Sequence, residues 1–236
     1  ITLKNKNKDF FFFEKQDVRS VMGALIYLVK TKLPEYIGTS PFEIQVLTPM
    51  RKGELGVEHL NEVLQYYLNP ASESKKEKEG RTGVFREGDK VMQVKNNYKL
   101  EWKITNAKGF SVEEGLGVFN GDMGVIKQIN TYSERITVVF DENREVEYPY
   151  SNLDELELAY AITIHKSQGS EYPAVVLPLL SGPPILCNRN LLYTAITRAQ
   201  KCAAIVGRQS MVEQMIHNET EQKRYSGLNE CLKDGI

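Results

Sequence analysis

The sequence predicts an α/β protein in which a helix-covered parallel sheet is interrupted by a small inserted β module. Apolar strands alternate with helical patterns before about residue 80 and again after about residue 150, which is typical of a parallel sheet. Between Val84 and Tyr148 the apolar period becomes that of short antiparallel strands, separated by Asn-Gly and Asp-Glu-Asn turns. The two flanks are therefore expected to share one parallel sheet.

The first flank contains two strand–helix units. The expected elements are a strand at 9–14, a helix at 17–30, a buried strand at 43–49 and a helix at 56–68. The four phenylalanines at 10–13 indicate a buried strand, and Asp17 favours the following helix through its dipole. Pro70 ends the second helix.

The second flank follows the β module. The expected elements are a helix-like segment at 159–169, a strand at 172–179, a helix at 191–200 and a strand at 201–207. Residues 71–81 are charged and lack apolar anchors, so they are predicted to form a mobile surface linker. These patterns place the α/β domain at residues 1–80 and 150–236, and the inserted β module at residues 81–149.

Composition limits the classes of function. The 236 residues carry a formal net charge of −1, so any nucleic-acid binding must come from local patches. No apolar run approaches the roughly 20 residues of a membrane helix, and we expect a cytoplasmic, intracellular protein without membrane contact. The cysteines and histidines are too scattered for a disulfide framework or a zinc site, which predicts reduced thiols and no metal. They are Cys187, Cys202, Cys231, His59, His165 and His217.

A polar cluster, HKSQGSE at 165–171, separates two apolar segments. Gly169 would let backbone approach a ligand closely, and Glu171 at a strand edge could accept a hydrogen bond from a ribose hydroxyl. Donors suited to phosphodiester oxygens also gather here, namely Thr163, His165, Lys166 and Ser167. Taken singly, each of these residues is more simply read as a packed turn residue or a solvated charge.

A second polar group lies in LLYTAITRAQ at 191–200. Thr194, Thr197 and Arg198 fall within one helical turn. The planar guanidinium of Arg198 suits a phosphate, because it donates two hydrogen bonds and keeps its charge. By itself, this arginine is better explained as a surface residue at a helix end, where a cation is favourable to the dipole.

The order of these strings carries more information than any one residue. AYAITIHKSQGSEYPAVVLP followed by LLYTAITRAQ resembles motifs V and VI of superfamily 1 DNA helicases in the RecD-like branch. Residues 44–70 are similar to the motif IVa region of that branch, and residues 85–98 and 117–129 to the SH3-like insertion in its second motor domain. The resemblance implies a RecA-like domain 2A, related to P-loop NTPases, with a small SH3-like β-barrel, 2B, inserted.

The resemblance also implies residue roles. Gly169 and Glu171 match nucleotide-facing positions, and Arg198 matches the catalytic arginine finger that reaches the γ-phosphate. The positions implied to face single-stranded DNA are Thr163, His165 and Ser167, with Thr48 as a backbone contact. Arg51 and Lys52 either add positive charge beside Thr48 or form a solvated turn. In the insertion, three asparagines either line the exit of the DNA strand or simply make turns, namely Asn96, Asn97 and Asn120.

The sequence contains no Gly-Lys dipeptide and hence no phosphate loop. Asp141-Glu142-Asn143 imitates a magnesium-binding strand end, but an alternating strand follows it, so we predict a hairpin turn. The family places the phosphate loop and the magnesium carboxylates on a preceding domain 1A. ATP and Mg²⁺ are therefore expected only in the full-length protein. Residue 1 is Ile, which favours a fragment, and this chain alone is not expected to hydrolyse ATP.

The implied function is the C-terminal motor half of an ATP-dependent helicase that moves 5′ to 3′. The implied partners are single-stranded DNA, domain 1A of the same protein and, in some settings, subunits of a nuclease complex. The alternative is a non-motor module that binds single-stranded DNA, or a degenerate helicase paralogue. A purely structural or interaction domain is a third alternative, which the intact GSE and TRA strings at 169–171 and 197–199 disfavour.

Overall fold

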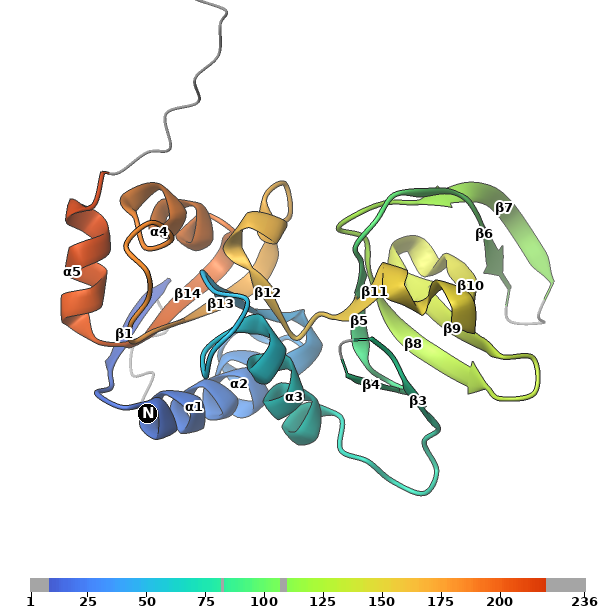
Figure 1. Ribbon diagram of the computed structural model, residues 1–236, viewed down its shortest axis with the longest axis horizontal. Coiled ribbons are helices and arrows are strands. Elements are labelled where there is room, and N and C mark those ends of the chain that lie inside the picture. The colour runs from blue at the N-terminus through green and yellow to red at the C-terminus, as the bar shows by residue number, and fades with distance from the viewer. Residues whose placement is uncertain (1–8, 82, 107–109, 220–236) are drawn as a thin grey trace, which may run out of the picture.

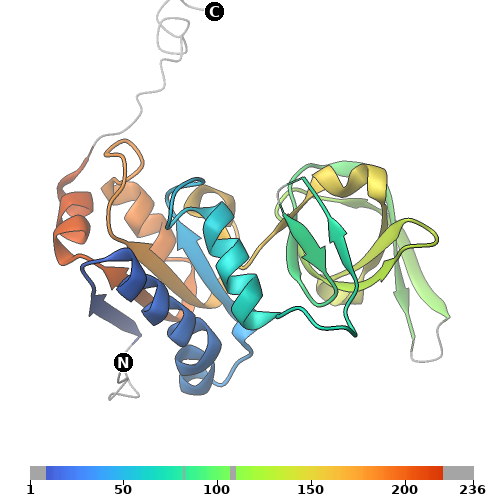
Figure 2. The ribbon, with the colours of Figure 1, turned by 60° about the horizontal axis from the view of Figure 1, so that its bottom comes forward.

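Two sheets divide the chain into two lobes, which lie side by side in Figures 1 and 2. The structure is a computed structural model, and it describes residues 9–81, 83–106 and 110–219. One lobe contains a five-stranded sheet, and the other contains a seven-stranded sheet together with a small two-stranded hairpin. The chain passes from the first lobe to the second after residue 68 and returns at residues 159–160.

The five-stranded sheet is parallel throughout and has the order β1-β14-β13-β2-β12. Its strands are β1 Phe10–Glu14, β2 Ile44–Thr48, β12 Ala161–Thr163, β13 Tyr172–Leu179 and β14 Ala199–Gly207. Strands from both flanks of the sequence therefore share one sheet, which confirms the prediction of an interrupted α/β domain. The expected burial of the four phenylalanines is wrong: Phe10 is 44% exposed and residues 11–13 are only half-buried, because β1 is an edge strand.

Helices cover both faces of this sheet. They are α1 Val18–Tyr27, α2 Leu33–Ile37, α3 Val57–Leu68, α4 Arg189–Ile196 and α5 Gln209–His217, with a π-helical turn at Leu28–Lys32 between α1 and α2 and a 3-10 turn at Pro41–Glu43. Residues of α1 and α3 pack with one side of the central strands, and residues of α4 and α5 pack with the other. The side chain of Asp17 begins α1 by accepting a hydrogen bond from the Ser20 amide at 2.9 Å.

The seven-stranded sheet is antiparallel, has the order β11-β5-β8-β9-β10-β6-β7, and coils into a small barrel (Figure 2). Its strands are β5 Lys90–Gln93, β6 Asn97–Thr105, β7 Ser111–Val118, β8 Met123–Asn130, β9 Arg135–Phe140, β10 Glu145–Pro149 and β11 Leu156–Leu158. Alternate residues such as Ile136 and Val138 point into its core. A 3-10 helix at Tyr150–Glu155 leads to β11, so the sheet takes its last strand from beyond residue 149.

Residues 159–169 do not form the helix-like segment that the sequence predicts. They form β12 and a 3-10 turn at Ile164–Ser167, followed by a loop. The apolar run before residue 165 fits a buried strand as well as a buried helix. Pairing of Ala161–Thr163 with Val46–Thr48 of β2 decides in favour of the strand.

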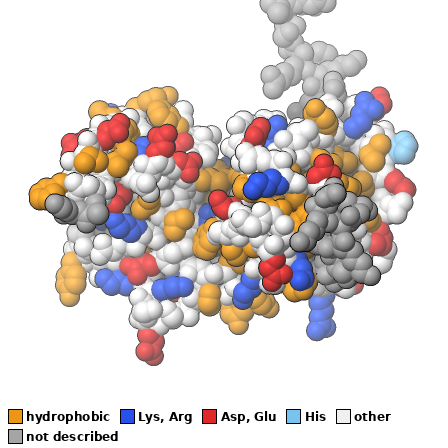
Figure 3. All heavy atoms as spheres, turned by 180° about the vertical axis from the view of Figure 1, so that it is seen from behind, with side chains coloured by type: hydrophobic (Ala, Val, Ile, Leu, Met, Phe, Trp, Pro, Cys, Tyr) orange, Lys and Arg blue, Asp and Glu red, His pale blue; other side chains and the backbone are white. Residues whose placement is uncertain are grey.

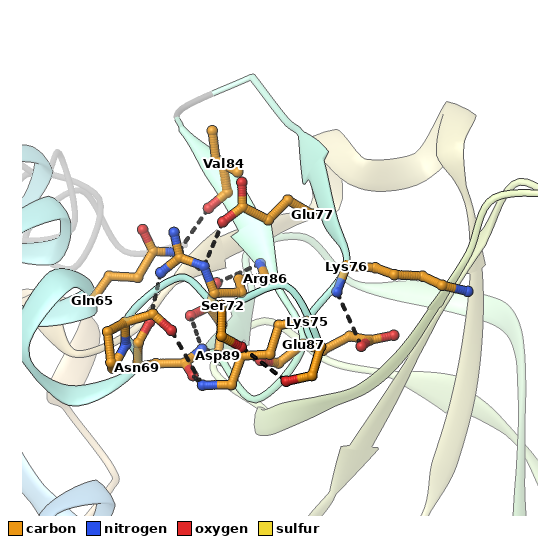
Figure 4. A network of polar contacts seen from close by, with 12 residues as sticks. Gln65, Asn69, Ser72, Lys75, Lys76, Glu77, Val84, Arg86, Glu87 and Asp89 are labelled. Atoms are coloured by element: carbon orange, nitrogen blue, oxygen red, sulfur yellow. Dashed lines mark hydrogen bonds and ion pairs between the residues drawn. The ribbon is translucent and has the colours of Figure 1, made fainter.

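The charged stretch at 71–81 is more ordered than a mobile linker. Its residues Glu77–Glu79 form β3, which pairs with β4, Val84–Arg86. The Arg86 guanidinium donates to the Glu77 carboxylate at 2.6 Å, and the Glu87 carboxylate accepts from the Lys76 amide at 3.2 Å (Figure 4). Local ion pairs and hydrogen bonds therefore order a segment that has little apolar surface to bury.

The Asp141–Asn143 segment forms the predicted turn between β9 and β10. It is a short 3-10 turn in which Glu142 and Asn143 have positive φ values of 61° and 58°. This left-handed backbone closes the hairpin and confirms that the segment is not the end of a parallel strand.

Composition led to expectations about the cysteines and about membrane helices. Cys187 and Cys202 are buried and free, and Cys231 lies outside the described residues. In the part of the chain that the structure describes, no helix is both long and apolar enough to cross a bilayer. The described cysteines thus pack as small apolar side chains.

A buried carboxylate joins the two lobes. Asp89, which precedes β5, accepts hydrogen bonds from Gln65 Nε2 at 2.6 Å, Asn69 Nδ2 at 2.7 Å and the Tyr160 hydroxyl at 2.9 Å. It also accepts from the Arg86 amide at 2.6 Å. Figure 4 shows Gln65, Asn69 and Arg86 converging on Asp89. Burial raises the pKa of Asp89, while these hydrogen bonds act in the opposite direction.

The next residue, Lys90, is buried and joins the lobes in the same place. Its Nζ donates to the Phe42 carbonyl at 2.7 Å and to Gln45 Oε1 at 2.9 Å. Gln45 Nε2 in turn donates to the carbonyl of Ala159 at 3.1 Å and to that of Tyr160 at 3.2 Å. Burial lowers the pKa of Lys90 to about 8, although nearby carboxylates oppose this shift.

We expect Asp89→Ala to lower the free energy of unfolding by about 2–4 kcal/mol, because it leaves buried donors without their acceptor. Denaturant unfolding measures this change. The control is Asp154→Ala, which removes an exposed carboxylate paired with Lys95 and should change stability little. Equal effects of the two substitutions would contradict a structural role for the Asp89 contacts.

Lys90 should make stability depend on pH. Its pKa in the folded chain, about 8, lies below the ordinary value of 10.5, so the unfolded chain binds this proton more tightly. Stability must then rise with pH between these two values. From about pH 7.5 to about pH 9.5, we expect the unfolding free energy of the natural chain to gain about 1–2 kcal/mol relative to Lys90→Met. Parallel pH profiles of the two proteins would show that Lys90 keeps its ordinary pKa.

Candidate nucleotide and nucleic-acid site

The loop that carries the polar cluster connects two opposite ends of the parallel sheet. It begins after Thr163, which pairs with Thr48 at the carboxyl end of β2. It ends at β13, where Ala174 pairs with Ile44 at the amino end of β2. These two levels are four residues apart on β2, or roughly 13 Å. One continuous loop therefore presents side chains at both ends of the strands.

At the carboxyl end, the loop exposes two of the predicted DNA-facing residues. Thr163 is half-buried, and its hydroxyl accepts a hydrogen bond from the Lys166 amide at 3.3 Å, which begins the 3-10 turn. His165 lies in this turn and is exposed. Thr163 ends β12 and His165 follows it, on the side where Thr48 ends β2, so the structure brings these three positions together.

The hydroxyl groups of Thr48 and Ser167 point into the protein. Both side chains are fully buried. Thr48 Oγ1 donates to the Leu55 carbonyl at 2.7 Å, and Ser167 Oγ donates to the Ile164 carbonyl at 2.7 Å. These bonds hold the loop after β2 and the turn after β12, so the two residues shape the surface without exposing their own hydroxyls.

At the amino end, the loop exposes Gly169 and Glu171. Gly169 has φ 88°, and a Cβ placed there would meet no heavy atom within 4 Å. The backbone conformation therefore requires glycine, whereas the space around it remains open. The Glu171 carboxylate accepts a hydrogen bond from Gln200 Nε2 at 3.3 Å.

Arg198 lies beside this end of the loop, immediately after α4. Its guanidinium donates to the carbonyls of Thr194 at 3.3 Å and Ser170 at 3.2 Å, and to the Thr197 hydroxyl at 3.4 Å. Its own carbonyl accepts from the Tyr172 amide at 2.8 Å. The loop and the helix are therefore joined through this single residue.

The partners of the Arg198 guanidinium are all neutral. No ion pair among the described residues includes Arg198, although several other arginines pair with carboxylates. The side chain is only half-buried. A fixed, accessible guanidinium without a counter-charge is suited to bind an anion such as a phosphate.

Arg51 and Lys166 differ from Arg198, because both contact the carboxylate of Glu157. Arg51 Nη2 lies 2.6 Å from Glu157 Oε1, and Lys166 Nζ lies 3.1 Å from Glu157 Oε2. Burial raises the pKa of Glu157, but these two cations outweigh burial and hold the pKa below its ordinary value. Sequence reasoning missed Glu157, and the available signal was a charged residue set between Leu156 and Leu158 of a short strand.

Asn96 lies on the inserted lobe, where its Oδ1 accepts a hydrogen bond from the Asn120 amide at 2.9 Å. Asn97 Nδ2 donates to the Glu155 carboxylate at 2.9 Å. The Asn96 side chain thus contacts a turn residue, whereas Asn97 joins the start of β6 to the 3-10 helix that precedes β11. Tyr98 and Phe119 lie close by, with exposed rings in edge contact and centroids 5.7 Å apart.

Charge is mixed over the surface. On the face that Figure 3 shows, basic and acidic side chains are interspersed over both lobes rather than gathered by sign. This agrees with the net charge of −1. Binding of an anionic ligand therefore depends on individual cations such as Arg198 and on which carboxylates neutralise the others.

Two family models match different parts of the chain. A model described as the SH3 domain of ATP-dependent RecD-like DNA helicases matches residues 60–140, which include most of α3 and all of β3 to β9. A model described as the UvrD-like helicase C-terminal domain matches residues 158–206, which contain the polar loop and Arg198. The two lobes thus correspond to two known helicase domains.

Similar proteins are found among characterised sequences and solved structures. The ATP-dependent RecD2 DNA helicase of Deinococcus radiodurans is 40% identical over 160 residues, which cover 68% of this chain and 19% of that protein. The RecBCD enzyme subunit RecD of Mycolicibacterium smegmatis is 30% identical over 191 residues, which cover 81% and 29%. This chain therefore spans less than a third of the length of either relative.

Among solved structures, the chain is similar to the Pif1 helicase from Bacteroides in complex with ADP-AlF3 and single-stranded DNA. It is 16% identical, the match covers 91% of this chain and 54% of that one, and the TM-score is 0.47. The assignment therefore depends on the family models and the sequence relatives, which agree with each other. The chain belongs to the RecD-like family of superfamily 1 helicases.

Proposed function

We propose that this chain is the C-terminal half of the motor of an ATP-dependent DNA helicase that moves 5′ to 3′ along single-stranded DNA. Residues 1–80 and 150–236 would be motor domain 2A and residues 81–149 the 2B insertion, with β3 and β11 extending the inserted lobe beyond these bounds on both sides. The observation that carries this proposal is the guanidinium of Arg198, which neutral partners hold beside Gly169 and Glu171. In a helicase family, a fixed cation at that place is suited to the triphosphate of a nucleotide.

On the nucleotide side, this chain would supply charge and position. Arg198 would donate to the γ-phosphate and stabilise the charge that develops on it during transfer. The exposed backbone at Gly169 leaves room for a ligand, and Glu171 would accept from a ribose hydroxyl. Ser170 and Thr197 would keep the guanidinium in place until the ligand engages it.

Domain 1A of the same protein would supply the remaining groups. The phosphate loop is assigned there because this sequence has no Gly-Lys dipeptide. Mg²⁺ is assigned there because the described residues offer no group of three or more His, Cys, Asp or Glu side chains suited to hold it. Arg198 would then act across the cleft between the two domains.

On the DNA side, Thr163 and His165 would contact the strand directly, since both are accessible at the carboxyl end of the sheet. Thr48 and Ser167 would hold the loops in shape through their buried hydroxyl bonds. Arg51 would add positive charge, and Asn96 would contribute from the insertion. A loop with one end toward DNA and the other toward nucleotide gives a physical route to couple hydrolysis with movement.

The relatives support proposals about partners. Those named as RecBCD enzyme subunits support further protein subunits as partners of the intact protein, and the relative named RecD2 helicase supports action on DNA. The alternative of a non-motor module that binds single-stranded DNA predicts DNA binding without ATP hydrolysis. An ATPase measurement on the intact protein therefore separates the two.

We expect Arg198→Ala in the intact protein to lower DNA-stimulated ATP hydrolysis by about 10³-fold or more, because it removes the charge that stabilises the transferred phosphoryl group. Binding of single-stranded DNA should change little. Steady-state ATPase assays with oligothymidylate measure the effect. The control is Arg208→Ala, whose guanidinium also bonds a neutral carbonyl, that of Gln16, but follows the opposite end of β14. Retained turnover in Arg198→Ala would refute the arginine-finger assignment.

We expect His165→Ala to weaken single-stranded DNA binding by roughly 3- to 10-fold while changing nucleotide affinity less, because His165 lies at the DNA end of the loop. Fluorescence anisotropy at defined salt measures DNA affinity, and titration with a fluorescent nucleotide measures the other ligand. His217→Ala on α5 is the matched control. An unchanged DNA affinity would show that the two ends of the loop do not have separate ligands.

A further inference from the structure

Glu157 brings together two loops and two lobes. It lies on β11 of the seven-stranded sheet, whereas Arg51 follows β2 and Lys166 follows β12 of the parallel sheet. Each carboxylate oxygen takes one cation, Arg51 at 2.6 Å and Lys166 at 3.1 Å. A second carboxylate, Glu58, lies 3.4 Å from Arg51 Nε. The four side chains form one charge cluster.

This cluster lies beside the proposed DNA end of the loop. Arg51, Glu157 and Lys166 line a small hollow together with Thr163. Their side chains are 46%, 20% and 29% exposed, so the two cations are more accessible than the carboxylate between them. A ligand that arrives from solvent would therefore meet the cations first.

The cluster has no net charge, because two cations face two carboxylates. Phosphodiesters bind through cations that are free to replace the counterions of the strand. Arg51 and Lys166 cannot provide this attraction fully while Glu157 neutralises them. A phosphate group, like a carboxylate, offers two oxygens to two donors, and it could take the place that the Glu157 carboxylate holds.

We propose that Arg51 and Lys166 form a phosphodiester-binding site which Glu157 occupies in the absence of DNA. Glu157 would thus act as an internal competitor that lowers the affinity of this loop for single-stranded DNA. When a backbone phosphate displaces the carboxylate, Lys166 and its turn would separate from β11 of the inserted lobe. This inference rests on the proposed function, since it requires DNA to run along the carboxyl end of the sheet.

Glu157→Gln in the intact protein tests the inference, because it keeps the shape of the side chain and removes its charge. Anisotropy titrations of oligothymidylate, without nucleotide and over a series of salt concentrations, give the affinity and its salt slope. We expect affinity at low salt to rise by roughly 3- to 10-fold. The slope of log K against log salt should steepen by about 0.7, the value for one further phosphate contact on a single strand.

Glu62→Gln is the matched control, since it changes the net charge equally but its carboxylate pairs with His59 rather than with Arg51 or Lys166. A second variant, Arg51→Gln, gives an independent test. It should lower affinity more in the Glu157→Gln background than in the natural protein, because Arg51 is neutralised only in the latter.

The results separate a failure of this inference from a failure of the proposed function. Equal behaviour of Glu157→Gln and Glu62→Gln would overturn the inference and leave the proposed function standing. Weaker binding by Glu157→Gln, with an unchanged unfolding midpoint, would also overturn it and make Glu157 a residue that positions the cations. Failure of the unaltered intact protein to bind single-stranded DNA would overturn the proposed function as well.

Discussion

The chain must cross between two sheets, and the polar groups buried at the crossing need hydrogen-bond partners within the protein. Asp89 accepts from Gln65 of α3, from Asn69 at its end and from Tyr160. Lys90 donates to Gln45 of β2 and to Phe42, which precedes that strand. An unpaired buried charge costs several kcal/mol, so these contacts fix where α3, β2 and β12 lie relative to the barrel. The loops after β2 and β12 carry the candidate site, and their position depends on this junction.

The direction of the strands in the parallel sheet determines which ends of the sheet the polar loop at 165–171 reaches. Because β12 and β13 run in the same direction, the connection between them has to return along the sheet, from the level of Thr163 to the level of Tyr172. A single loop consequently faces both ends of the strands. Arg198 fastens the amino end through the Ser170 carbonyl, and the 3-10 turn fastens the carboxyl end through Thr163. This arrangement makes the loop a connection between two ligand surfaces in our proposal.

The cations of the site fall into two classes. Arg198 is held by neutral oxygens and keeps its charge available, whereas Arg51 and Lys166 share the carboxylate of Glu157. The first class suits a ligand that is bound and released in every cycle at one fixed place. In our proposal, the second would form a surface whose attraction for DNA stays moderate, because a motor that moves along a strand would have to release each phosphate. The near-neutral net charge of the chain is consistent with both.

The sequence by itself determined the interrupted α/β fold and the motif residues, because apolar periodicity and the order of local strings are properties of neighbouring residues. It wrongly predicted a helix-like segment at residues 159–169, since a buried apolar run satisfies strand and helix alike. Only pairing with β2 made residues 161–163 of this segment β12. Tertiary structure alone also revealed Glu157 between Arg51 and Lys166, and the buried contacts of Asp89 and Lys90. Such partners are far apart in the chain, so their charges meet only after both sheets have formed.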